Sequence, residues 1–428
     1  MSKPRRGFTL VELLAVIVIL AVILVIAVPS IMSTITESRK GALASSAKLI
    51  ASSVETAYIS NQTLGIEKDI ECRDISNYTD EDYAICSIKF VDGKAQVKII
   101  GNGKFEGMAV CSGTKENAEV VGECPLTAVE KIKSLATESN KEGLATDDFG
   151  NIRYAGGSAD VKNYVEFGND NELWRIIGIF KVTTVDETTG EEKVEKLMKI
   201  VKDTSIGNYS WDSSASGVNR GYGVNEWSQA DLKTELNELY LNQKNGDCYN
   251  DKNNSKVACD FRTTGIKDAY RGMIENVVWN TGAITDESTD VSTLERSSLY
   301  NAERGTINGK KCTSGVYCND SVSRTTIWTG KVGLIYLSDY GYASTSGTNI
   351  SNTAISTTNW LSGSVYWTIS PYARSSRAYH AWFVYSSGVS PDCFASDGGG
   401  VRPTVYLKSD VSITSGDGSS TDPYRISV

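Results

Sequence analysis

The single histidine of the chain, His380, is the one imidazole that could serve as the base for a serine or cysteine nucleophile. Such a pair needs an imidazole within hydrogen-bond reach of the hydroxyl or thiol, and a histidine-based zinc site needs more than one imidazole. One histidine in 428 residues therefore disfavours such zinc sites and leaves ordinary packing as the expected role of His380. We assign no catalytic residue and predict that the protein is not an enzyme.

The nine cysteines fall into local couples that lack the Cys-x-x-Cys spacing of metal sites. In a protein exported past the membrane, such couples are typical of disulfides that close loops, and a cytosolic location would leave nine thiols without a purpose. Many other pairings are open, and Cys393 is either a free thiol or displaces one of the expected pairs. The expected pairs are Cys72 with Cys86, Cys111 with Cys124, Cys248 with Cys259, and Cys312 with Cys318.

Several aspartates lie in polar, glycine-rich loops and could bind calcium through their oxygens. None of these loops has EF-hand spacing, and solvated turn residues are the competing interpretation. We therefore predict no cofactor and no metal ligand, with calcium as the open alternative. The aspartates are Asp247, Asp251, Asp260, Asp392, Asp397, Asp417 and Asp422.

Aromatic and basic residues gather late in the chain. Exposed aromatic rings could stack on a sugar or on a protein partner, and neighbouring arginines could hold an anion. Packing in a core is the competing interpretation for the aromatic members. The candidate ligand patch is Trp360, Trp367, Tyr372, Arg374, Arg377 and Trp382.

Length and charge restrict the class of protein. A chain of 428 residues is long enough for two or three folding units, and 40% hydrophobic residues can build real cores. The net charge of -9 argues against a general nucleic-acid binder, which needs a basic face. We predict no binding to nucleic acid.

The N-terminus carries the strongest motif. A basic start is followed at once by Gly7-Phe8-Thr9-Leu10-Val11-Glu12 and then by an apolar run from Ala15 to Val28. A secretory signal would have a small-residue cleavage site beyond the apolar run, and none of the usual kind is present. Glu12 is costly inside a bilayer, by about 2.5 kcal/mol or more near its centre, so it needs a role.

This segment resembles the cleavage and methylation signature of type IV prepilins and of the pseudopilins of type II secretion. The resemblance implies that a prepilin peptidase cuts between Gly7 and Phe8 and methylates the new amino group of Phe8. It also implies that the Glu12 carboxylate meets the Phe8 amine of a neighbouring subunit, a pairing that makes a buried charge tolerable. Assembly into a filament by pilus machinery follows from the same resemblance.

The segment 8–28 is about 31 Å long as a helix, which suits one membrane span. Lys3, Arg5 and Arg6 are expected to stay in the cytoplasm, with the rest of the chain outside. Beyond Pro29, which we expect to loosen or kink the helix, apolar residues continue at spacings near three, four or seven. These spacings predict an amphipathic helix that reaches about Ser60.

The remaining chain divides by composition. Short alternating segments around Asp92-Gly93 predict a hairpin within a small antiparallel head, residues 61–146, after the helix at 8–60. All eight tryptophans follow residue 150, which marks an aromatic-rich surface module at 147–428. Its segments are mostly short and β-like, with helices expected at 229–241 and 266–278.

The surface module resembles an uncharacterised domain of bacterial surface proteins that often follows a prepilin helix. The segments that carry the resemblance include 148–154, 333–343, 366–371 and, as the most specific part, 401–409 with 415–418. That family looks related to the C-type-lectin-like fold shared with formylglycine-generating enzymes, although the thiol pair of those enzymes has no counterpart here. The expected fold class is α+β, with a long N-terminal helix, a small antiparallel head and a large, loop-rich, mostly β, lectin-like domain.

These features predict a precursor with residues 1–7 as leader, held in the cytoplasmic membrane and then displayed at the cell surface in a filament. The large last module would serve adhesion or binding to a glycan or protein partner. A pseudopilin of a type II secretion or DNA-uptake system is the alternative. Whether the chain is a major, minor or tip subunit stays open.

Overall fold

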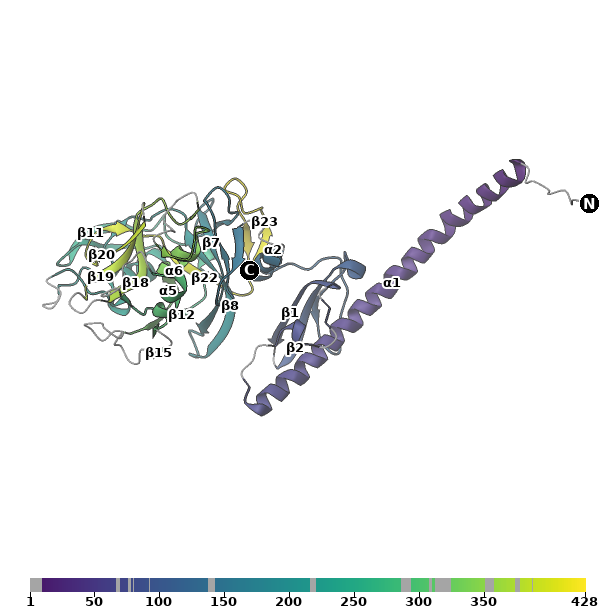
Figure 1. The fold of residues 1–428 in the computed structure, drawn as a ribbon, viewed down its shortest axis with the longest axis horizontal. Coiled ribbons are helices and arrows are strands. Elements are labelled where there is room, and N and C mark those ends of the chain that lie inside the picture. Colours follow the sequence, from purple (N-terminus) through teal and green to yellow (C-terminus); the bar gives the residue numbers. More distant parts are fainter. Residues whose placement is uncertain are drawn as a thin grey trace, which may run out of the picture. The chain divides into compact units, whose positions relative to one another are not determined.

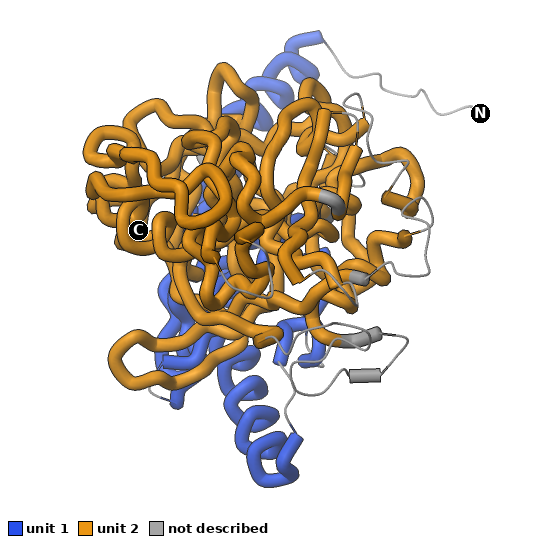
Figure 2. The backbone as a smooth tube through the Cα atoms, turned by 90° about the vertical axis from the view of Figure 1, so that its left-hand side faces the viewer, with its two compact units in different colours: residues 1–125 blue, residues 126–428 orange. Residues whose placement is uncertain are grey.

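The computed structural model describes residues 10–66, 70–75, 78–79, 81–91, 93–137, 143–215, 221–285, 294–307, 310–311, 325–350, 358–373, 378–386 and 388–428. The chain forms two compact units, unit 1 with residues 1–125 and unit 2 with residues 126–428 (Figure 2). Each unit has its own hydrophobic core. Residues 126–146, which the composition assigned to the small head, therefore lie in unit 2.

Helix α1 (Leu10–Leu64) runs without interruption through the first part of unit 1 (Figure 1). Among the described residues it is the one helix long and apolar enough to cross a membrane. Between Leu10 and Ile35, the apolar side chains whose burial is described are largely exposed. Pro29 lies inside the helix and removes one backbone donor, yet the helix continues on both sides of it.

The part of α1 from Leu43 to Val54 packs on a three-stranded antiparallel sheet. Leu43, Ala47, Ile50 and Val54 are fully buried, and their spacing of three and four residues places them on one helical face. The strands are β1 (Tyr83–Val91), β2 (Lys94–Gly101) and β3 (Ala109–Gly113), in the order β1-β2-β3. Two 3-10 turns, η1 (Cys72–Asp74) and η2 (Gly103–Phe105), complete the unit.

The predicted hairpin is confirmed. Strands β1 and β2 pair from Tyr83 opposite Gly101 to Val91 opposite Lys94. Gly93, in the turn between them, has φ +75°, a left-handed conformation that favours glycine. The alternation of buried and exposed residues along β2 turns Ala95, Val97 and Ile99 toward α1.

One ionic contact ties α1 to this sheet. The Glu55 carboxylate accepts a hydrogen bond from the Ala95 backbone N–H (3.1 Å) and pairs with Lys115 Nζ (2.7 Å). The hydrogen bond from Lys115 lowers the pKa of Glu55. Helix, hairpin and loop are therefore joined by polar as well as apolar contacts.

Unit 2 is built on an antiparallel sheet whose nine described strands differ in length. Its centre is the long hairpin of β7 (Leu173–Val185) and β8 (Glu192–Lys202). Residues 174–180 of β7 and 197–202 of β8 are buried. The sheet order is β16-β12-β7-β8-β22-β17, and β4, β5 and β6 extend it through β7. The other strands are β4 (Leu144–Thr146), β5 (Ile152–Tyr154), β6 (Tyr164–Glu166), β12 (Val277–Asn280), β16 (Ile327–Gly330), β17 (Val332–Gly333) and β22 (Thr404–Leu407).

A second sheet has the order β13-β18-β19-β20, with β13 parallel to β18 and the other pairs antiparallel. Its strands are β13 (Ile284–Thr285), β18 (Tyr366–Ala373), β19 (His380–Tyr385) and β20 (Gly388–Phe394). Four two-stranded pairs are β9 (Asn208–Tyr209) with β21 (Gly399–Gly400), β10 (Asn245–Asp251) with β11 (Ser255–Asp260), β14 (Thr306–Ile307) with β15 (Lys310–Lys311), and β23 (Ser412–Ser415) with β24 (Arg425–Ser427).

The helices of unit 2 are short. They are α2 (Ala128–Thr137), η4 (Trp227–Gln229), α3 (Asp231–Thr234), the π-helix η5 (Glu235–Tyr240), α4 (Asp268–Arg271), α5 (Arg296–Glu303) and α6 (Leu337–Tyr342). The helix expected at 229–241 is present as the succession η4, α3 and η5. The prediction of a helix at 266–278 was wrong beyond the single turn of α4. Helix α4 ends at Arg271, and Val277 begins β12.

Aromatic side chains fill the core of unit 2. Six tryptophans are less than 2% exposed, among them Trp174 and Trp279, and several stack edge to face on neighbouring rings. The predicted fold class, α+β with a long apolar N-terminal helix followed by mostly antiparallel β structure, is confirmed.

Candidate functional site

The first candidate site is the start of α1. Glu12 lies in its first turn, among exposed apolar side chains such as Leu13 and Ile17. Gly7 and Phe8, the predicted cleavage residues, fall outside the described residues. The structure places this carboxylate in the first described turn of a helix that is long and apolar enough to cross a membrane.

Three of the expected disulfides are present. Cys72 is joined to Cys86 and Cys111 to Cys124 in unit 1, and Cys248 is joined to Cys259 across the β10–β11 hairpin of unit 2. Cys312 and Cys318 lie outside the described residues. Cys393 is buried in β20, and its Sγ lies 3.0 Å from the Tyr385 hydroxyl.

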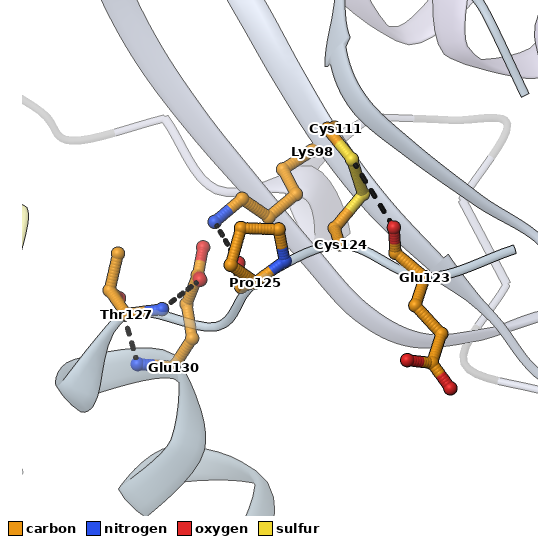
Figure 3. The surroundings of a disulfide bond; sticks show 7 residues. All are labelled: Lys98, Cys111, Glu123, Cys124, Pro125, Thr127 and Glu130. Carbon is orange, nitrogen blue, oxygen red and sulfur yellow. Dashed lines mark hydrogen bonds between the residues drawn. A yellow bond between two sulfur atoms is a disulfide. The ribbon is translucent and has the colours of Figure 1, made fainter. Parts of the chain in front are cut away.

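The disulfide of Cys111 and Cys124 fixes the end of unit 1 (Figure 3). The next residue, Pro125, accepts a hydrogen bond from Lys98 Nζ on β2 (3.1 Å) through its backbone oxygen. Within unit 2, Thr127 and Glu130 cap α2 reciprocally, because Glu130 accepts from the Thr127 backbone N–H and Thr127 Oγ1 accepts from the Glu130 backbone N–H. Backbone pairing of Thr127 with Ser412 anchors the same residue to the C-terminal hairpin. Hydrogen bonds within each unit therefore hold the residues on the two sides of the peptide bond between Pro125 and Leu126.

The predicted ligand patch is not an exposed surface. Trp360, Trp367, Tyr372 and Trp382 are at most 4% exposed and belong to the core, so the proposal of an aromatic binding patch was wrong for them. Trp367 and Tyr372 lie on β18 and Trp382 on β19, two paired strands that are buried over nearly their whole length, so the large apolar area of these rings is removed from water. Arg374 and Arg377 lie outside the described residues. His380 is also buried, between aromatic rings on β19.

A buried group of charges in unit 2 surrounds Asp339 of α6. Its two carboxylate oxygens accept hydrogen bonds from Lys199 Nζ (2.5 Å) on β8 and from Arg153 Nη1 (2.7 Å) on β5. Arg153 Nε also donates to Asp147 (2.5 Å), which follows β4. All four side chains are at most 3% exposed. The group joins two strands of the large sheet to α6.

The pKa values in this group follow from burial and from charge. Burial lowers the pKa of Lys199 to about 8, although the Asp339 carboxylate opposes the shift. Burial alone would raise the pKa of Asp339, but the charges on Lys199 and Arg153 outweigh it and lower that pKa. Nearby, burial raises the pKa of Glu303, whose carboxylate accepts hydrogen bonds from Ser338 and Ser370. The charges are balanced within the core, which is the arrangement of a structural network.

The sequence contains one indication of this group of buried charges that the predictions did not include. Lys199 interrupts the apolar run from Leu197 to Val201, so a lysine stands where the pattern of β8 requires a buried residue. A buried lysine needs an acidic partner, and none of the candidate acidic residues singled out from the sequence is that partner. Asp339 is far away in the sequence and is brought near only by the tertiary fold.

Of the seven aspartates considered for calcium, Asp392 has a side chain outside the described part of the structure. Asp247 pairs with Lys256, Asp260 with Arg262, and Asp422 with Arg425, so these carboxylates are held by neighbouring cations. Among the described residues, no group of three histidine, cysteine, aspartate or glutamate side chains is arranged to hold a metal ion.

Comparison with known proteins identifies one segment. Residues 2–28 match the family model of the prokaryotic N-terminal methylation motif. No curated protein and no solved structure matches the chain. The matched segment covers the predicted cleavage residues, Glu12 and the apolar run of α1, and it supports a precursor of the type IV pilin or pseudopilin kind that prepilin peptidase recognises.

Proposed function

We propose that the chain is a type IV pilin-like subunit that is cut after Gly7, methylated on Phe8 and assembled into an extracellular filament that displays unit 2. The observation that carries the proposal is the methylation motif at residues 2–28, continued by an apolar helix with Glu12 in its first turn. The role is structural and not catalytic, and it uses no cofactor.

Assembly depends on α1. Its exposed apolar residues between Leu10 and Ile35 lie in lipid before assembly and against the helices of other subunits afterwards, where burial of apolar area stabilises the fibre. Glu12 pairs with the methylated amine of Phe8 in a neighbouring subunit, because a charge in an apolar environment requires a partner. The basic leader keeps the N-terminus in the cytoplasm, so both units emerge on the outer side.

Unit 2 supplies adhesion or binding to a glycan or protein partner. Its size and separate core support a module that is carried by the fibre. The lectin-like relation stays a prediction from the sequence. A pseudopilin of a secretion or DNA-uptake system uses the same motif and helix, and it is distinguished by short filaments and by loss of transport when the chain is deleted.

Immunogold electron microscopy with an antibody to residues 126–428 tests the proposal in intact cells. We expect gold on surface filaments in the wild type and none on filaments of a Glu12→Ala strain. Glu37→Ala is the matched control, since Glu37 is an exposed carboxylate of α1 beyond the apolar part. Protein confined to the membrane in the wild type, with no labelled fibre, would overturn the filament assignment.

A further inference from the structure

Lys199 and Asp339 form a buried pair that neither the methylation motif nor the assembly of a fibre explains. Lys199 lies on β8 and Asp339 on α6, and 140 positions of sequence separate them. Lys199 Nζ is 2.5 Å from Asp339 Oδ2, and both side chains are 0% exposed. An amine and a carboxyl group held in contact away from water are the two groups from which an amide bond forms.

The two atoms that would bond are close together. A carboxyl C–O bond is about 1.2 Å long, so Asp339 Cγ lies at most about 3.7 Å from Lys199 Nζ. Groups poised to react are typically about 3–3.5 Å apart, and holding them there replaces an encounter in solution. The fold holds both: β8 pairs with β7 and β22, and Ser338, beside Asp339, donates to the buried Glu303 through its backbone N–H and its hydroxyl.

Four aromatic rings enclose the amine of Lys199. Their centroids lie 4.0–5.7 Å from Nζ, and each of these residues is at most 3% exposed. Burial lowers the pKa of Lys199 to about 8, so its neutral, nucleophilic form is more accessible than in an exposed lysine. The rings belong to Phe180, Trp279, Tyr336 and Tyr406.

Two further donors orient the carboxyl group of Asp339. Arg153 Nη1 donates to Oδ1 (2.7 Å), and the Tyr336 backbone N–H donates to Oδ2 (3.0 Å). When an amine adds to a carboxyl carbon, negative charge develops on the oxygens, and donors already in place stabilise it. Arg153 also pairs with Asp147, so it keeps an acidic partner if the charge of Asp339 is lost.

We propose that Lys199 and Asp339 condense after folding into an intramolecular isopeptide bond. One ammonium proton passes to Oδ2 along the existing hydrogen bond, and the neutral Nζ attacks Cγ. The Cγ–Oδ2 bond then breaks, and a second Nζ proton leaves with Oδ2 as water. The ion pair supplies every atom of the amide and of the water, so no oxidant, reductant or co-reactant is needed. Oδ1 becomes the amide oxygen and still accepts from Arg153.

Condensation removes a cost that the ion pair carries. Two charges taken out of water are expensive, and their mutual attraction repays this only with excellent geometry. The bond replaces both charges by one neutral amide. Glu303 pairs with Arg304 (3.6 Å), so the loss of the Lys199 charge leaves this buried acid with a cation. The closed surroundings also keep water from returning to hydrolyse the bond.

The bond closes residues 199–339 into a covalent loop that fixes the centre of the large sheet to α6. A cross-link over such a length of chain restricts the unfolded state more than the short disulfide loop of this unit does. An amide is also insensitive to reducing agents. The inference concerns unit 2 alone and does not depend on the filament assignment.

Mass spectrometry of the full chain, purified in detergent and with its disulfides reduced, tests the proposal. We expect an intact mass lower than that of the sequence by one water molecule. After denaturation, trypsin should fail to cut after Lys199 and should release residues 197–202 joined to residues 332–374. Fragment ions should place the link between Lys199 and Asp339.

Lys202 is a control within the same strand. It pairs with Glu172 (2.9 Å), but these side chains keep some access to water, at 10% and 16% exposed, so trypsin should cut after Lys202. Lys202→Met should retain the link. Lys199→Met and Asp339→Ala should each have the full mass of their sequences.

The wild type decides the question, because its measurement does not depend on whether a variant folds. Tryptophan fluorescence checks that the purified chain is folded. A wild type with the full mass of its sequence and normal cleavage after Lys199 would overturn the proposal. A loss of water that persists in Lys199→Met would overturn it too, since dehydration elsewhere would then explain the mass. Immunogold labelling of the fibre is independent of these outcomes.

Discussion

Lys199 Nζ lies 2.5 Å from Asp339 Oδ2, and neither side chain is exposed to solvent. This ion pair joins β8 to α6 in the core of unit 2, and Arg153 extends it to β5. Charged groups at this depth are tolerated because each has a partner of opposite sign. The network therefore makes stability depend on every member.

We expect Lys199→Met to destabilise unit 2 by about 3–5 kcal/mol, because it leaves the carboxylate of Asp339 with one cation in place of two. Urea denaturation followed by tryptophan fluorescence measures the change, since all eight tryptophans lie in unit 2. Lys267→Met is the control: its pair with Asp170 is 40% and 75% exposed, and we expect a loss under about 1 kcal/mol. Similar losses in both variants would contradict a special role for the buried pair.

Glu235 makes the stability of unit 2 depend on pH. Its Oε1 accepts a hydrogen bond from the Tyr249 backbone N–H (2.9 Å), whereas Oε2 is buried without a hydrogen-bond partner. Burial raises the pKa of Glu235 to about 8, from an ordinary value of 4.5, and the charge of Asp231 adds to the shift. Between these two values the folded chain holds a proton that the unfolded chain has released, so stability falls as pH rises from about 5 to 8.

We expect Glu235→Gln to lose this pH dependence. In the wild type it changes the free energy of unfolding by up to about 1.4 kcal/mol per pH unit. Urea denaturation at pH 5, 7 and 9 measures the difference between variant and wild type. Glu187→Gln, at an exposed carboxylate that pairs with Lys331, is the matched control and should keep the wild-type slope. The assignment fails if the difference between Glu235→Gln and wild type is constant with pH.

The disulfide of Cys248 and Cys259 closes a short loop in unit 2 and restricts the unfolded chain. We expect the double variant Cys248→Ala/Cys259→Ala to lose about 3 kcal/mol in stability. The tryptophan transition in urea measures it. The corresponding variant of Cys72 and Cys86 should leave that transition unchanged, because those residues belong to the core of unit 1. An equal shift in both variants would show that the two units unfold as one.

Leader removal can be followed directly. Co-expression with a prepilin peptidase should yield a protein that begins at a methylated Phe8, as determined by mass spectrometry of the N-terminal peptide. Gly7→Val should leave residues 1–7 in place, because a branched side chain then stands at the cleaved bond. Glu12→Ala should still be cut, since the role proposed for Glu12 is in assembly and not in cleavage. Efficient cutting of the Gly7→Val precursor would contradict the assigned site.

Local patterns carried most of the correct predictions. The apolar run that becomes α1, the hairpin at Gly93 and the three cysteine couples each depend on residues close in the sequence. The apolar spacing beyond Pro29 also predicted the helical face that packs on the sheet of unit 1. Such patterns need no knowledge of the tertiary fold.

The errors arose where distant segments meet. Trp367 and Trp382 were considered as parts of an exposed ligand patch, but they lie on the paired strands β18 and β19 and are buried in the core. Asp339 was not singled out because its partners lie on β5 and β8, more than a hundred residues earlier. Arg153 on β5 and Arg296 on α5 line one cavity of unit 2 although more than a hundred residues separate them in the sequence. Composition cannot reveal contacts that the sheet order creates.

The disulfide between Cys111 and Cys124 has a mechanical consequence. In a fibre anchored through α1 and held at its far end through unit 2, tension must pass along the chain from β3 to Thr127. The disulfide bond carries that tension, so the loop of residues 112–123 bears none of it. Roughly 40 Å of extended chain therefore stays closed within the loop under tension. Only Pro125 and Leu126 remain between the bridge and the first anchored residue of unit 2. The joint therefore behaves as a nearly inextensible tether, and a pulled subunit transmits force before it lengthens.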